Sequence, residues 1–181
     1  MFNIPEVMRS HWENQGMPKA TAEDMACIEA TIGSRLPSPY VEFVTQFGFV
    51  VFEDIPGMRD AFHYTVTFDG EEEKRQGDIS FFHEPGELIQ VHKYSTTAES
   101  EEDDMRPLFP AHFVPIASDA GQGEILLELG DHAGRVWYWT EKEWAWGMGD
   151  NTWLGFVADD FYEFINKLQP FVSPSQGGLP T

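Results

Sequence analysis

Cysteine is nearly absent from this sequence, with Cys27 as the single copy among 181 residues. One thiol cannot form an intramolecular disulfide, and it cannot build the thiolate cluster that holds structural zinc or an iron–sulfur centre. Cys27 falls on the apolar face of an expected helix, where a buried and unreactive thiol is the usual state. Because proteins of the cytoplasm rarely carry disulfides, the composition favours a cytoplasmic location.

Positive charge is also scarce. Lysine and arginine number 11 against 31 aspartate and glutamate residues, which gives a formal net charge of −20. Nucleic acids and anionic lipid surfaces are bound through lysine and arginine, so we expect neither direct nucleic-acid binding nor a membrane partner. A basic protein partner would be attracted by this field, although the same acidity can serve solubility alone.

Long apolar runs are missing as well. No stretch approaches the ~20 apolar residues that cross a bilayer, and residues 1–16 lack the basic and apolar segments of a secretory signal. The hydrophobic content of 41% still suffices for a packed core, and 181 residues fit one domain. We expect an N-terminal extension over residues 1–19, one domain over 20–170 and a flexible tail over 171–181.

Three segments have the periodicity of amphipathic helices. Thr21 and Asp24 form an approximate capping box at the start of the first helix, which is expected over 21–33. Apolar residues recur at helical spacing over 38–47 and again over 157–168. The sequence therefore predicts two helices near its beginning and one near its end.

Runs of β-branched and aromatic residues, separated by Gly, Pro and Asp, predict strands. These strands are expected at 49–52, 63–68, 78–82, 113–117, 124–129 and 135–139. Residues 69–77 have the composition of a solvated connection, and 85–94 are ambiguous with a slight helical bias. Because the helices flank the strands instead of alternating with them, the order predicts a single α+β domain with a largely antiparallel sheet and helices packed at one side.

Three strings are more specific than this general patterning. They are the helix junction over 28–43, the strand and turn FVPIASDAGQGE over 113–124, and the strand GRVWYW over 134–139. In these strings the chain resembles the SUKH superfamily of bacterial toxin-neutralising immunity proteins, whose domain also occurs in a regulator of yeast cell-wall assembly. It departs from the family pattern at Gln122, where glycine is frequent. The resemblance implies a non-catalytic domain that binds another protein, in many bacterial members the toxin domain of a competition system.

The best candidate for a metal cluster lacks the spacing that such a site needs. His83 and Glu84, together with Glu87, bring possible ligands close in sequence. A helical zinc site requires two histidines four residues apart, and Pro85 with Gly86 interrupts that geometry here. We therefore expect no metal and no cofactor.

Catalytic patterns are not found either. The carboxylates Asp159 and Asp160 suit the positive end of the last helix dipole better than acid–base catalysis. Glu128 with Asp131 is a second pair of carboxylates, and the sequence shows no concave site for acid–base catalysis by either pair. Residues 121–123 lack the lysine and helix of a phosphate loop and predict a turn. No Gly-x-Ser-x-Gly elbow is present. These features favour a protein that is not an enzyme.

Aromatic and acidic segments are the candidates for partner binding. Trp137 and Trp139 share one face of a strand and suit the core, whereas two further tryptophans lie among glycine and charged residues, as interface anchors do. An acidic run over 99–104 would supply a charged rim. The predicted partner-binding residues are Trp144, Trp146, Glu101, Glu102, Asp103 and Asp104.

Three functions stay open at this point. The first is an immunity-type protein that binds a toxin domain, such as a basic one, and has no chemistry of its own. The second is a regulatory scaffold whose acidity serves solubility, and the third is a hydrolase with unrecognised carboxylates. A toxin gene beside this one would favour the first function. The sequence names neither the partner, nor the binding face, nor the oligomeric state.

Overall fold

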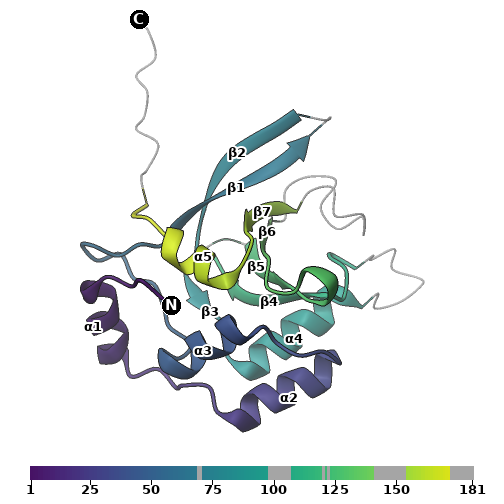
Figure 1. Cartoon of the computed structure of the whole chain (residues 1–181), viewed down its shortest axis with the longest axis horizontal. Helices are drawn as coiled ribbons and strands as arrows, with labels where there is room; N and C mark the ends of the chain where they lie inside the picture. The colour runs from purple at the N-terminus through teal and green to yellow at the C-terminus, as the bar shows by residue number, and fades with distance from the viewer. Residues whose placement is uncertain (69–70, 98–106, 120, 122, 141–153, 172–181) are drawn as a thin grey trace, which may run out of the picture.

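The computed structural model describes residues 1–68, 71–97, 107–119, 121, 123–140 and 154–171 (Figure 1). In chain order its elements are α1 (Glu6–Gln15), α2 (Ala22–Ile32), α3 (Ser38–Gln46), β1 (Ala61–Phe68), β2 (Glu71–Asp78), β3 (Phe81–Phe82), α4 (Pro85–Thr96), β4 (Phe113–Ser118), β5 (Gly123–Glu128), the short 3-10 helix η1 (Gly130–His132), β6 (Val136–Thr140), β7 (Gly155–Ala158) and α5 (Phe161–Lys167). No helix among these residues is long and apolar enough to cross a membrane.

The strands form one antiparallel sheet in the order β2-β1-β7-β6-β5-β4-β3. The centre is a meander of β4, β5 and β6, as the sequence predicts. At one side β1 pairs with β2 along its whole length but with β7 only at Thr65 and Phe156. The β1–β2 hairpin therefore stands away from the rest of the sheet (Figure 1).

The helices pack at one side of this sheet, which confirms the predicted α+β class. All five contribute to the larger core cluster, which also takes Ile125, Leu127 and Tyr138 from the strands. Phe43 of α3 lies near its centre, fully buried among aromatic rings. The alternate strand residues Leu126 and Trp139 belong to a second, smaller cluster. Since neighbouring side chains of a strand point to opposite faces, the two clusters lie on opposite sides of the sheet.

The expected capping box begins α2. The backbone N–H of Asp24 donates to Thr21 Oγ1 at 3.1 Å, and the Thr21 N–H donates back to Asp24 Oδ2 at 2.8 Å. These bonds from Thr21 hold the pKa of Asp24 below its ordinary value, because they favour the ionised carboxylate. Gly33 ends the helix with a φ of 71°, a left-handed conformation that glycine adopts without strain.

Cys27 corrects one prediction on this helix. The thiol was expected on the buried face, but the side chain is exposed. Met25 and Ile28 are the buried residues of α2. Cys27 is adjacent to Ile28 in sequence, so its side chain is rotated by about 100° from that of Ile28 around the helix axis. The apolar stripe is thus narrower than the sequence suggests.

Two strand predictions are also wrong. Residues 49–52 form no continuous strand, and only Val51 makes an isolated bridge, with Phe81. The apolar run there fills the core, since Phe49 and Val50 are buried. Conversely, residues 69–77 were expected as a connection, but β2 occupies most of them. β2 is an edge strand, and the residues in its first half are exposed. Their charged side chains therefore stay in water while the backbone pairs with β1.

The two ends of the domain differ from expectation as well. The final helix starts later than predicted, because β7 precedes it and Asp160 caps α5 by accepting a hydrogen bond from the Glu163 N–H at 2.8 Å. Near the beginning, α1 forms within residues 1–19. It buries Met8 and Trp12 in the larger core cluster. The ambiguous segment 85–94 is helical, as part of α4.

Candidate functional site

The predicted partner-binding residues lie outside the described part of the chain. These are Trp144, Trp146, Glu101, Glu102, Asp103 and Asp104. The described residues next to both segments converge, however. Ser95 and Leu108 flank residues 98–106 and are joined by a hydrogen bond from the Leu108 N–H to the Ser95 carbonyl at 2.7 Å. Together with Trp139, which precedes residues 141–153, they line one cavity.

This cavity lies between α4 and the turn that joins β4 to β5, and its volume is about 470 Å³. Apolar and aromatic side chains form one part of its lining, and carboxylates and a hydroxyl form the other. The side chains that define its chemistry are Tyr94, Leu108, Trp139, Glu87, Glu124 and Ser118. Among the described residues that line it there is no lysine or arginine, so this part of the lining is acidic as well as aromatic.

Helix α4 provides the outer wall of the cavity through its periodicity. Glu87 and Tyr94 are seven residues apart and share one side of the helix. Leu88 and His92 turn inward and are buried, and the ring of His92 is held 3.1 Å from the Ala111 carbonyl oxygen. The side that faces the cavity remains open, since Tyr94 is 54% exposed.

A buried histidine fixes the two carboxylates of the cavity. His83 is 2% exposed and follows β3 directly. Its Nε2 lies 2.8 Å from Glu124 Oε2, and its Nδ1 lies 3.2 Å from Glu87 Oε2, a contact with the length of an ion pair but not the angle of a hydrogen bond. Ser118 Oγ donates to the second oxygen of Glu124 at 3.1 Å. The Glu124 carboxylate is therefore fixed by His83 at one oxygen and by Ser118 at the other.

This environment favours the imidazolium form of His83. Burial by itself would lower the pKa of His83, because it penalises the charged ring. The hydrogen bond and charge of Glu124, joined by the nearby carboxylate of Glu87, outweigh burial and raise the pKa of His83 above its ordinary value. Only the protonated ring presents N–H groups to both carboxylates at once.

Of the two carboxylates considered with His83 as metal ligands, the structure brings only Glu87 to the ring, and the second carboxylate is Glu124 instead of Glu84. Glu84 is exposed and precedes α4. The two carboxylates approach opposite nitrogens of one ring, so the three side chains do not converge on a common point. Among the described residues, no group of His, Cys, Asp and Glu could hold a metal ion.

The turn between β4 and β5 positions Glu124. Asp119 accepts hydrogen bonds from the N–H groups of Gly121 at 2.7 Å and Gly123 at 2.9 Å, and the Tyr138 hydroxyl donates to its other oxygen. Burial, followed by the bond to Asp119, raises the pKa of Tyr138. Gly121 and Gly123, the glycines compared with a phosphate loop, thus donate their N–H groups to Asp119 of the same turn.

The remaining sequence candidates have structural roles. Glu128 is buried and accepts a hydrogen bond from the Trp137 indole at 2.8 Å, while Asp131 is exposed on η1. Asp160 caps α5, and Asp159 lies 3.7 Å from Arg135. Glu128, Asp159 and Asp160 thus each contact a residue in or next to a strand or helix.

Taken together, the fold and site define a single α+β domain with an acidic, aromatic-lined cavity. The chain belongs to the SMI1/KNR4 family (SUKH-1), whose family model matches residues 19–167. It is also 24% identical over 156 residues to the SPbeta prophage-derived uncharacterized protein YokK of Bacillus subtilis (strain 168), an alignment that covers 84% of this chain and 72% of that protein. No solved structure matches the chain. The family membership confirms the resemblance found in the three strings of the sequence.

Proposed function

We propose that this protein is a non-catalytic binding domain that acts as an immunity protein, neutralising a toxin domain by covering its active site or substrate surface. Membership of the SUKH-1 family supports a binding domain without chemistry of its own. The observation that carries the proposal is the acidic cavity beside α4, in a chain with a net charge of −20. The prophage origin in the name of the related protein fits a gene that travels with competition systems.

The chemistry of the cavity suits a basic partner. Toxins that act on nucleic acids bind phosphate through lysine and arginine, and a chain of opposite charge can occupy the same surface. Acidic side chains also raise the rate of association by electrostatic steering. Inside the cavity, Glu87 and Glu124 are placed to pair with a lysine or arginine side chain, and Tyr94 offers an exposed ring on which such a cation can stack.

The predicted anchors extend this proposal to neighbouring segments. Trp144 and Trp146 belong to residues 141–153, which follow Thr140 at the end of β6, and the acidic residues 101–104 belong to the segment that ends before Pro107. Tryptophan is enriched among the residues that dominate binding energy. We propose that these residues contact the same partner as the cavity.

Affinity measurements on variants test the proposed function. The ligand is the purified toxin domain encoded beside this gene, and binding is measured by titration calorimetry at increasing NaCl concentration. We expect Trp144→Ala with Trp146→Ala to weaken binding by at least about a hundredfold, because hot-spot tryptophans contribute about 2 kcal/mol or more each and about 1.4 kcal/mol is a factor of ten. Added salt should weaken binding further.

A matched control separates specific contacts from total charge. Glu101→Gln with Glu102→Gln removes two charges from the proposed interface, whereas Glu71→Gln with Glu72→Gln removes two from the exposed part of β2. The first pair should weaken binding more than the second. Unchanged affinity in the tryptophan variant, or binding that is independent of salt, would count against the proposal.

A regulatory scaffold is the second candidate, and the acidity of the chain is compatible with it. The two functions predict different gene neighbourhoods. A toxin gene adjacent to this one supports the immunity function, and its absence supports the scaffold.

A further inference from the structure

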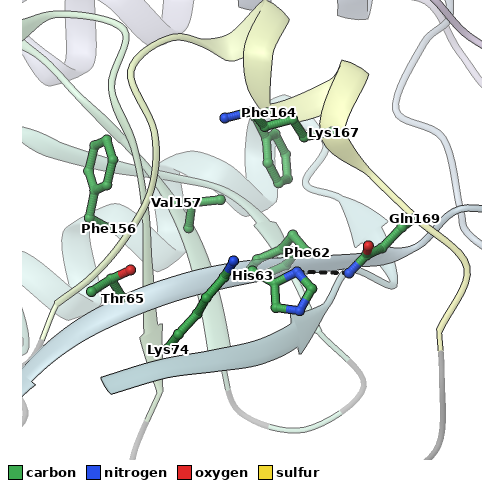
Figure 2. Close-up of a pocket in the computed structure, with 9 residues that line it drawn as sticks. All are labelled: Phe62, His63, Thr65, Lys74, Phe156, Val157, Phe164, Lys167 and Gln169. Carbon is green, nitrogen blue, oxygen red and sulfur yellow. Dashed lines mark hydrogen bonds between the residues drawn. The ribbon is translucent and has the colours of Figure 1, made fainter. Parts of the chain in front are cut away.

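A second groove lies between the β1–β2 hairpin and α5 (Figure 2). Its described lining residues are all different from those of the acidic cavity. Two contacts hold the groove open. Ala61 and Gln169 exchange backbone hydrogen bonds of 2.9 Å each, and Thr65 pairs with Phe156 of β7. Between these contacts β1 is not paired with β7, and a space of about 380 Å³ remains. The groove exists because the β1–β2 hairpin pairs with β7 at only one position.

The lining of this groove combines an apolar floor with nitrogen-bearing side chains. Phe156 and Val157 of β7 are half-buried and remain partly accessible. Figure 2 shows Lys74 reaching across from β2 and Lys167 lying over the groove from α5. His63 of β1 completes this arrangement on the side of the hairpin.

The charge of the groove is opposite to that of the chain. Aspartate and glutamate outnumber lysine and arginine by 31 to 11, yet the described residues that line the groove include two lysines and no acidic residue. Lys167 pairs with Glu163, but Lys74 makes no ion pair with any other described residue. The Lys74 ammonium group, which has no ion-pair partner among the described residues, thus faces an accessible apolar surface.

His63 adds a third possible donor. The Gln169 side-chain amide donates to His63 Nδ1 at 2.8 Å, which assigns the proton of the neutral ring to Nε2. The Nε2–H is then available to an acceptor. Two ammonium groups and one imidazole N–H around an apolar floor match the chemistry of a carboxylate that is attached to an apolar group.

We propose that this groove binds a short acidic peptide segment of a partner protein. Carboxylates of the segment would pair with Lys74 and Lys167, and an apolar side chain between them would cover Phe156. The volume is at the lower end of that of ligand pockets, so it suits a few residues in an extended conformation. This inference does not depend on the immunity function, since the described residues that line the groove and those that line the acidic cavity do not overlap.

Nuclear magnetic resonance on the ¹⁵N-labelled full chain tests the proposal. The probe is the tripeptide N-acetyl-Glu-Phe-Glu-amide, added to about 10 mM so that millimolar binding is detected. The matched control peptide is N-acetyl-Gln-Phe-Gln-amide. We expect the acidic peptide to shift the amide signals of His63, Lys74 and Gln169 in a saturable and salt-sensitive manner, and the neutral peptide to leave them in place.

Lysine variants locate the binding. Lys74→Gln and Lys167→Gln should each weaken binding of the acidic peptide by about threefold, and the double variant by about tenfold, as exposed ion pairs do. Lys93→Gln, which removes the same charge from α4 outside the groove, should leave it unchanged. Because Lys74 makes no ion pair within the described part of the chain, its variant reports on binding even if Lys167→Gln alters stability.

Three results would overturn the proposal. The acidic peptide could cause no shifts at the highest concentration, or shifts that cluster away from the groove. The neutral peptide could bind as well as the acidic one. Lys93→Gln could weaken binding as much as Lys74→Gln, which would show a general charge effect instead of a site.

Discussion

The buried contact between His83 and Glu124 fixes the geometry of the acidic cavity, and replacing Glu124 perturbs it directly. The two groups are 2.8 Å apart, with side-chain exposures of 2% and 14%. Hydrogen bonds to charged groups contribute about 1.5–3 kcal/mol, and neutral ones about 0.5–1.5 kcal/mol. Glu124→Gln keeps a neutral acceptor, so we expect it to lower the free energy of unfolding by about 1 kcal/mol. Glu124→Ala leaves the imidazolium facing Glu87 alone and should cost about 3 kcal/mol.

The same contact predicts a pH dependence with a definite sign. The pKa of His83 is raised in the folded protein, so the fold binds its proton more tightly than the unfolded chain does. The resulting stabilisation is fully present below the ordinary pKa of 6.5 and is lost as pH rises through the higher folded pKa. Between these two values the free energy of unfolding falls by up to about 1.4 kcal/mol per pH unit.

Urea unfolding followed by tryptophan fluorescence measures both effects, at pH values from about 6 to about 9. Wild type should lose stability across this range, and His83→Gln should lose less. Glu13→Gln, which changes an exposed carboxylate on α1, is the control for the loss of one charge. Identical pH slopes in wild type and His83→Gln, or equal stability of Glu124→Gln and Glu13→Gln, would refute the reasoning.

Two further predictions concern the core and are measured by the same unfolding assay. Trp12 is 2% exposed and packs edge-on against Phe43, so Trp12→Ala should cost about 3–5 kcal/mol; a loss below about 1 kcal/mol would show that α1 is not part of the core. A side chain at residue 155 would overlap the ring of Tyr64, so Gly155→Ala should cost about 1–3 kcal/mol, whereas Gly86→Ala meets no neighbouring atom and should change little.

Features that depend on local chemistry could be predicted from the sequence. The capping box of Thr21 and Asp24 needs only residues three apart, and the β4–β6 meander follows from apolar runs joined by glycine-containing turns. The edge strand β2 could not be predicted, because its charged residues become a strand only by pairing with β1. Likewise, nothing local distinguishes the apolar run over 49–52, which is buried without forming a strand, from a true strand.

The candidate site was only half visible in the sequence. His83 and Glu87 are four residues apart and could be noticed together, but Glu124 is 41 residues from His83 and joins them only through the fold. The sequence signal for the contact between His83 and Glu87 was their spacing of four residues at the start of a helix. The groove at Lys74 was missed entirely, since its lining comes from four separate elements and the segment after α5.

The most direct test of the central claim measures the activity of the neighbouring toxin domain on its substrate while this protein is added in increasing amounts. A binding protein that covers the toxin should inhibit it stoichiometrically, with activity reaching zero near one equivalent and returning when the complex is dissociated by salt. Full toxin activity in the presence of excess protein would contradict the account. So would permanent inactivation by far less than one equivalent, because that result requires catalysis.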